Sequence, residues 1–359
     1  MKEELEKLAE QVIAGGIDKL KAEREKLMAE AIAILDGQEK KKIWSGYDHL
    51  PEGSAPERVI PGCLVLEGGS FRGVYTSGVL DVLMENGINL QTTIGTSAGA
   101  LNGYNYVAGE IGRSARINLG YRHDRRYFSP KTALKNHGVV GFSFLLDEIE
   151  EEIPFDQERF DREDRRFLVT VTDCENGEVR YCEKGITADI RQAVRASASM
   201  PYVSEMVDVD GIPCLDGGCA VKIPYRWAME NGYEKILVIR TRPEYFRSEP
   251  DGKRMKELTE RLYRNYPELV KCLLTQKEQY DTACDELEEL QRQGRILMIC
   301  PSGSIGTSTL EGDMERLGAL YLLGRRDAEV MLPEIRKYLE IEVEQCSDSK
   351  DYVIRRERT

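Results

Sequence analysis

The chain has 359 residues, of which 41% are hydrophobic, and this composition is sufficient for a sizeable globular core. Its formal net charge of -13 at pH 7 argues against nonspecific nucleic-acid binding and against strong adhesion to an anionic membrane. The sequence contains no run of about 18 apolar residues, so we expect no spanning segment and at most peripheral membrane contact.

The cysteines and the first residues bear on location and on metal binding. The N-terminal segment has neither the apolar core nor the small-residue cleavage site of a signal peptide, which predicts a cytoplasmic protein. The nine cysteines show no CxxC spacing, and the chain has only three histidines. We therefore expect reduced, buried thiols, no metal site and no cofactor.

Residues 1–60 are predicted to form a helical extension followed by a linker. Apolar residues recur at helical spacing over residues 1–36, and Gly15-Gly16 divides the pattern into two helices. The prolines at positions 51, 56 and 61 mark a turn-rich linker. The apolar stripe must pack on the rest of the chain, on a second copy or on lipid. Its mixture of Glu and Lys favours packing or a homodimer over a membrane.

From residue 63 onward, short apolar runs alternate with helical patterns. The helix expected over residues 74–86 is stopped by Gly87, and from about residue 252 the chain is helical and charged apart from one strand. Alternation of this kind predicts an α/β fold with an open, largely parallel sheet that is covered on both faces. The expected strands are "CLVLEGG", "TTIGTS", "RFLVTVTD", "KILVIRT" and "RILMIC".

Ser97 is the first candidate for a catalytic residue. It lies in Gly95-Thr96-Ser97-Ala98-Gly99, between a strand and a helix, which is the context of a nucleophile elbow. Glycines on both sides relieve the crowding in so tight a turn, and the helix N-terminus favours negative charge near the serine oxygen. The alternative interpretation is an ordinary N-cap serine.

No histidine is placed to activate this serine in the usual order. A hydrolase triad on this fold runs serine, acid, histidine along the chain, but His49, His123 and His137 all precede the downstream acid candidates. His123 and His137 are better interpreted as surface or loop residues. If Ser97 is a nucleophile, its base is therefore expected to be a carboxylate.

Asp216, in "CLDGG", is the candidate for that base. The two glycines that follow it allow the backbone to pass close by and leave the carboxylate facing a cavity, although Asp-Gly is also a common turn signal. A third fragment, "EGGSFRG", joins a strand to a helix but matches neither a P-loop nor a dinucleotide fingerprint. Such a turn points backbone N–H groups into one concavity, where they could hold an oxyanion. Arg72 could assist, bind a phosphate head group, or form an ion pair.

Taken together, the three fragments resemble the patatin-like phospholipase family, most closely its small bacterial members. The GGxxRG loop, GxSxG and DGG occur in the family's order, with "RASASMPYVSE" before the DGG and "KIPY" after it, and the resemblance covers residues 62–325. It implies a three-layer α/β/α sandwich and a Ser97–Asp216 dyad that hydrolyses lipid acyl esters without calcium. Many members carry a third glycine where this chain has Ser70, which bears on substrate size. The implied oxyanion and substrate-binding residues are Gly68, Gly69, Ser70, Phe71, Arg72 and Gly73, and the supporting glycines are Gly95, Gly99, Gly217 and Gly218.

The sequence therefore predicts a catalytic domain over residues 61–330 and a C-terminal helix and tail over residues 331–359. The expected activity is that of a serine acyl hydrolase, a phospholipase or lysophospholipase, with a phospholipid or other acyl-ester lipid as substrate. Two alternatives stay open. The same site could transfer the acyl group to an alcohol, or the chain could be an interaction protein with a vestigial dyad.

Overall fold

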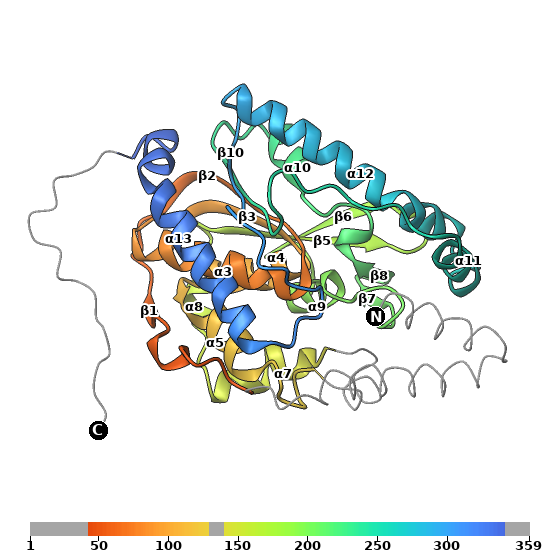
Figure 1. The fold of residues 1–359 in the computed structure, drawn as a ribbon, viewed down its shortest axis with the longest axis horizontal. Helices are drawn as coiled ribbons and strands as arrows, with labels where there is room; N and C mark the ends of the chain where they lie inside the picture. Colours follow the sequence, from red (N-terminus) through yellow and green to blue (C-terminus); the bar gives the residue numbers. More distant parts are fainter. Residues whose placement is uncertain (1–41, 129–139, 342–359) are drawn as a thin grey trace, which may run out of the picture.

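The computed structural model describes residues 42–128 and 140–341 (Figure 1). Within these residues, eight strands form one sheet in the order β10-β9-β2-β3-β5-β8-β7, with β6 paired to β5. A separate two-stranded ribbon joins β1 to β4. The strands are β1 Gly53–Ser54, β2 Ile60–Leu66, β3 Leu90–Thr96, β4 Glu110–Ile111, β5 Arg166–Asp173, β6 Val179–Glu183, β7 Val207–Val209, β8 Ile212–Asp216, β9 Ile236–Ile239 and β10 Leu297–Ile299.

The central part of the sheet is parallel, as the apolar runs predicted. All five expected strands are present, and the neighbours from β10 through β9, β2 and β3 to β5 run in the same direction. These strands are buried on both faces, which is why they appear in the sequence as continuous apolar runs rather than alternating patterns.

Beyond β5 the sheet becomes antiparallel, which the sequence pattern did not predict. β6 and β8 both run antiparallel to β5, and β7 pairs with β8 through a hairpin. The turn of this hairpin is Asp210-Gly211, and both residues have positive φ. The Asp-Gly turn signal therefore applies to residue 210, whereas Asp216 ends β8.

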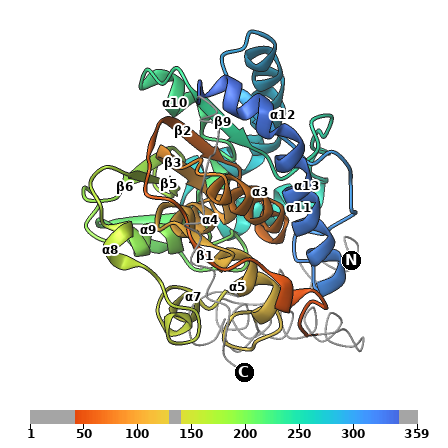
Figure 2. The same cartoon turned by 90° about the vertical axis from the view of Figure 1, so that its left-hand side faces the viewer.

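Helices cover both faces of the sheet. One face packs against α3, α4, α5, α9 and α13, and the other against α10 and α12. Figure 2 shows α3 and α13 on one side of β2 and β3, with α10 on the opposite side. The α-helices are α3 Gly73–Glu85, α4 Ala98–Val107, α5 Arg113–Tyr121, α7 Phe142–Leu146, α8 Gln157–Phe160, α9 Ile190–Ser197, α10 Tyr225–Glu230, α11 Lys253–Leu262, α12 Pro267–Arg292 and α13 Met314–Tyr338. The 3-10 helices are η1 Tyr47–His49, η2 Ser70–Arg72, η3 Glu148–Glu151 and η4 Gly217–Cys219.

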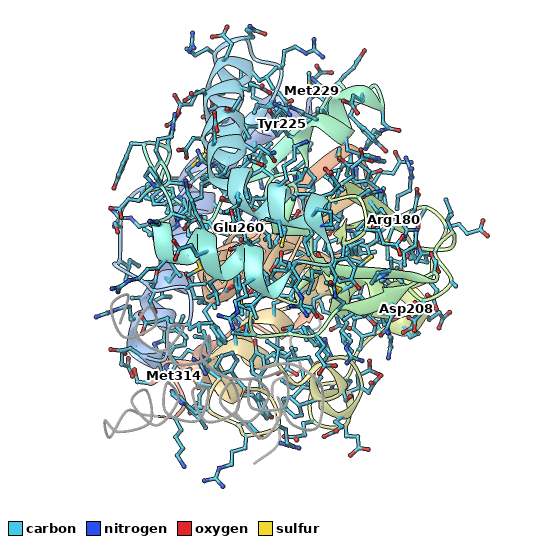
Figure 3. The ribbon with its side chains drawn as sticks, turned by 90° about the vertical axis from the view of Figure 1, so that its right-hand side faces the viewer. Arg180, Asp208, Tyr225, Met229, Glu260 and Met314 are labelled. Carbon is cyan, nitrogen blue, oxygen red and sulfur yellow. The ribbon has the colours of Figure 1, made fainter. Side chains whose placement is uncertain are left out.

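The C-terminal helices complete this three-layer arrangement. α13 crosses α3 (Figure 1), where Tyr75 donates a hydrogen bond to Asp327 at 3.0 Å and Tyr321 donates one to Asp81 at 2.8 Å. α13 also runs without a break through the domain boundary expected after residue 330. Figure 3 views the molecule from the side of α11, on which Glu260 is labelled, with the antiparallel strands marked by Arg180 and Asp208.

Several sequence predictions fall outside the described residues. The two helices expected over residues 1–36 and the tail after residue 341 lie there. The expected proline-rich linker, by contrast, lies within the described residues, and part of it is packed: Ala55 is buried, and Gly53–Ser54 pairs with β4. Of the nine cysteines, eight are described, all as free thiols, and all of these but Cys300 are buried.

Candidate active site

The candidate site lies at the carboxyl end of the parallel strands. The glycine-rich loop of residues 67–73 follows β2, and Ser97 follows β3, its hydrogen-bonded neighbour. Because adjacent parallel strands end at the same edge, both turns open there, which is where open α/β sheets bind ligands. The strand order therefore brings two of the three motifs together.

Ser97 occupies a strained elbow between β3 and α4. Its φ of 55° and ψ of -120° are not those of a helix N-cap, and its side chain makes no capping hydrogen bond. A Cβ on Gly95 would lie 2.5 Å from the carbonyl carbon of Gly99, and one on Gly99 would collide with the carbonyl oxygen of Leu66. The geometry favours the elbow interpretation over the N-cap interpretation.

Asp216 reaches the same position from the opposite direction. In the register of the sheet, Thr96 lies beside Thr170, and the next residue of β5, Val171, lies beside Asp216. Because β8 runs antiparallel to β5, its last residue, Asp216, lies beside the turn that holds Ser97. The Ser97 hydroxyl donates a hydrogen bond to Asp216 Oδ2 at 2.7 Å, and both residues are buried.

Burial sets the protonation of this pair. It raises the pKa of Asp216 to about 6, against the lowering effects of the Ser97 hydroxyl, the Gly218 N–H and the charge of Lys222. The Gly218 N–H donates to Oδ1 at 2.7 Å, so each carboxylate oxygen accepts a hydrogen bond. An ionised carboxylate held in this way can accept the proton of the serine, and its pKa lies near the range that suits a general base.

The glycine-rich loop leaves two backbone donors available. The N–H of Gly68 donates to the Lys222 carbonyl, that of Phe71 to the Thr309 carbonyl and that of Arg72 to the Gly69 carbonyl. The N–H groups of Gly69 and Ser70 have no acceptor within the described part of the chain. These two, rather than the whole loop, are the donors with which an oxyanion could be held.

Two cavities meet at Ser97, Ser70 and Met200. The first, the apolar cavity, has a volume of about 80 Å³. It lies among η2, α3, α4, α5 and α7, and Phe71, Leu101, Ile117, Leu145 and Leu146 are among the side chains that line it. Most of its lining is apolar, although Arg113 and several amide and hydroxyl side chains also line it.

The second, the cationic cavity, has a volume of about 640 Å³ and contains Asp216. Its basic lining residues are Arg72, Lys222, Arg242, Arg247 and Lys277, and its acidic ones are Glu67, Asp216 and Glu249. Ser97 therefore lies between a hydrocarbon-lined space and a charged one.

Several residues of the site were not identified from the sequence. Buried Ser197 accepts the N–H of Ser97 at 2.8 Å and so fixes the elbow, and Tyr280 of α12 donates to Glu67 at 2.7 Å behind the glycine-rich loop. Ser197 and Lys222 stand in the "RASAS" and "KIPY" fragments, whereas no local signal marks Tyr280 or Arg242. His49 and His123 line neither cavity, and His137 is outside the described residues.

Across residues 42–128 and 140–341, no group of three His, Cys, Asp or Glu side chains is placed to hold a metal ion. Within the same ranges, no helix is long and apolar enough to cross a membrane.

The arrangement can support nucleophilic acyl transfer, because it combines an elbow serine, a carboxylate acceptor and backbone donors. Residues 64–229 match the family model described as patatin-like phospholipase. The chain therefore carries a patatin-like phospholipase domain, which confirms the resemblance of its motifs. Residues 266–340 match a second model, described as a domain of unknown function, DUF6363.

The proteins similar to this chain include one from Escherichia coli and one of solved structure from Legionella pneumophila. The uncharacterized protein YjjU of Escherichia coli strain K12 is 26% identical over 284 residues, which cover 77% of this chain and 78% of the relative. The crystal structure of VipD from Legionella pneumophila matches 78% of this chain and 68% of its own at 14% identity, with a TM-score of 0.42.

Proposed function

We propose that the protein is a serine acyl hydrolase that cleaves lipid acyl esters with Ser97 as nucleophile and Asp216 as general base. The observation that carries the proposal is the 2.7 Å hydrogen bond from the Ser97 hydroxyl to a buried carboxylate at a strained elbow. The patatin-like phospholipase domain supports a lipid ester as the substrate class.

The reaction follows from this geometry in two steps. Asp216 accepts the hydroxyl proton as Ser97 Oγ attacks the ester carbonyl carbon, and the N–H groups of Gly69 and Ser70 stabilise the oxyanion. The C–O bond to the alcohol then breaks, the alcohol leaves with that proton, and an acyl-enzyme forms. Asp216 next activates water, which attacks the acyl-enzyme; the acid is released, and the proton returns to Ser97.

The test is labelling by an active-site-directed fluorophosphonate, together with turnover of a p-nitrophenyl ester. Wild-type protein should be labelled and active. Asp216→Asn should lose both properties almost completely, because the amide keeps the shape of the carboxylate but cannot accept the proton. His49→Ala, at an exposed position away from both cavities, is the matched control and should behave as wild type. Labelling of Asp216→Asn at the wild-type rate would contradict the proposed dyad.

Calcium independence is part of the same proposal. Each step uses side-chain and backbone groups of this chain, so we expect EDTA to leave ester turnover unchanged. Inhibition by EDTA that added calcium reverses would contradict it.

A further inference from the structure

Arg113 is the one charged side chain among the described residues that line the apolar cavity. It is 3% exposed, and its hydrogen bonds in the described part of the chain all go to uncharged carbonyl oxygens. Burial lowers its pKa, and the charges of Glu110 and Glu150, which do not line the cavity, offset this lowering only in part. A buried cation in such surroundings is costly, and an anion bound in the cavity would recover part of the cost.

Contacts with neighbouring residues fix the position of the Arg113 guanidinium. Nε donates to the carbonyls of Ile153 and Pro154 at 3.3 and 3.1 Å, and Nη2 donates to that of Ile153 at 3.3 Å. Nη1 donates to Asn105 Oδ1 at 2.5 Å, and the guanidinium carbon lies 5.0 Å from the ring centroid of Phe155. Within residues 42–128 and 140–341, one N–H group on each of Nη1 and Nη2 is therefore left without an acceptor.

Two hydroxyl groups that line the same cavity also have a hydrogen to donate. Asn105 Nδ2 donates to Ser114 Oγ at 2.8 Å, so the amide that accepts from Arg113 also positions Ser114, whose own hydrogen has no acceptor among the described residues. The Tyr104 hydroxyl is buried and has no hydrogen-bond partner in the described residues. Burial raises its pKa to about 12, against the lowering charges of Arg191 and Arg113. Tyr104, Arg113 and Ser114 together form the donor cluster.

The donor cluster lies away from the nucleophile along α4, which forms one wall of the apolar cavity. Ala98, Leu101 and Asn105 line the cavity on successive turns of this helix. At roughly 1.5 Å per residue, the helix rises about 12 Å between Ser97 and Asn105. An acyl chain attached at Ser97 and lying in this cavity would therefore meet the donor cluster with its far end.

On the basis of the proposed function, we propose that the donor cluster binds a carboxylate at the far end of the acyl chain, so that the enzyme prefers acyl groups of dicarboxylic acids to plain fatty acyl groups of equal length. Arg113 supplies the opposite charge, and its N–H groups match the geometry of a carboxylate. The hydroxyl groups of Tyr104 and Ser114 donate to the remaining lone pairs. An anion suits this cluster better than an alcohol does, because every unused group of the cluster can act as a donor.

The experiment compares kcat/KM for mono-p-nitrophenyl suberate with that for p-nitrophenyl octanoate, at about pH 8, where the free carboxyl group is ionised. The two acyl chains have equal length, and the leaving group is the same. Wild-type enzyme should prefer the suberate by at least tenfold, the discrimination expected from charged hydrogen bonds. The methyl ester of the suberate, which has a similar shape but no charge, should lose this preference.

The outcomes separate this inference from the proposed function. Equal rates on the suberate and the octanoate would overturn the carboxylate site while leaving the ester hydrolase intact. Hydrolysis of the methyl-capped suberate at the rate of the free acid would overturn it as well, because the charge would then not be recognised. No turnover of any ester would overturn the proposed function itself.

The decisive variant is Tyr104→Phe. It removes a hydroxyl that has no partner in the described residues, and it keeps the ring that stacks on Phe155 at a centroid distance of 4.4 Å. A purely structural Tyr104 predicts an unchanged ratio of suberate to octanoate turnover, whereas the donor cluster predicts a roughly tenfold fall in that ratio, mainly through KM for the suberate. Tyr181→Phe, at an exposed position outside both cavities, is the matched control and should keep the wild-type ratio.

Arg113 provides the second test. Arg113→Gln should abolish the preference for the suberate, and Arg113→Lys, which keeps the charge but loses the planar arrangement of N–H donors, should retain part of it. Circular dichroism checks that each variant is folded, and Arg113→Lys and Tyr104→Phe decide the matter if Arg113→Gln is not. The full wild-type preference in any of these folded variants would contradict the assignment.

Discussion

The two cavities that meet at Ser97 differ in chemistry and in the part of the chain that forms them. Except for Leu310, every residue that lines the apolar cavity lies between residues 70 and 200, inside the patatin-like phospholipase domain. The cationic cavity combines residues of that domain with residues 242–309, which follow it. Ser97 and nearly all residues that line the apolar cavity thus belong to the family domain. The cationic cavity depends in part on residues that lie outside that domain. Residues that follow the domain therefore contribute to the charge of the cationic cavity.

The largest expected effect comes from Ser97→Ala, because Ser97 is common to both cavities. Loss of a covalent nucleophile typically costs several orders of magnitude in kcat. Turnover should fall by about that amount for every ester, whatever its chain or head group, with unchanged circular dichroism. If turnover fell for charged esters alone, the two cavities would serve different reactions.

The pH profile tests Asp216, the proposed general base in the cationic cavity. Burial raises the pKa of Asp216 to about 6, and only the ionised carboxylate accepts the serine proton. The value of kcat/KM should therefore rise with pH through about 6 and level off above it, with a roughly tenfold loss between pH 7 and pH 5. A p-nitrophenyl ester isolates this effect, because its leaving group has no phosphate to titrate. A profile that is flat from pH 5 to 8 would exclude Asp216 as the base.

Filling the apolar cavity should change the selectivity of the enzyme for the length of the acyl chain, without altering the cationic cavity. Ile117 of α5 lines this cavity, and Ile117→Trp would occupy part of its small volume. The ratio of kcat/KM for an octanoyl to a butanoyl ester should fall roughly tenfold, as lost hydrocarbon contacts in a pocket predict. Ile190→Trp, outside both cavities, controls for overpacking. An unchanged ratio in Ile117→Trp would place the acyl chain elsewhere.

The smallest effect is expected at Ser70, which lines both cavities. Its φ of 51° favours glycine, and its hydroxyl lies 3.3 Å from Met200 Sδ. Ser70→Gly should widen this junction and raise kcat/KM for branched esters a few-fold relative to linear ones. Its free energy of unfolding should change by no more than about 1 kcal/mol, since relief of strain and the added chain entropy oppose each other. Complete loss of activity would show that the hydroxyl itself takes part.

The sequence by itself determined the parallel core and the three motifs. Buried parallel strands give continuous apolar runs, so β2, β3 and β5 could be predicted from the sequence. Turns with a close backbone approach require glycine, so the glycines beside Ser97 and Asp216 marked these two residues as candidates. The alternation of helices and strands along the chain was predicted from the same patterns.

Only the tertiary structure decided which residues share the site. Asp216 meets Ser97 because β8 runs antiparallel to β5, and the pairing direction of so short a strand has no local signal. Lys222, Arg242 and Tyr280 are far apart in sequence, and each taken alone has the pattern of an ordinary surface or core residue. They converge because β9 lies beside β2 and α12 packs over that end of the sheet. The cationic cavity is therefore a property of long-range packing, which residue spacing along the chain does not encode.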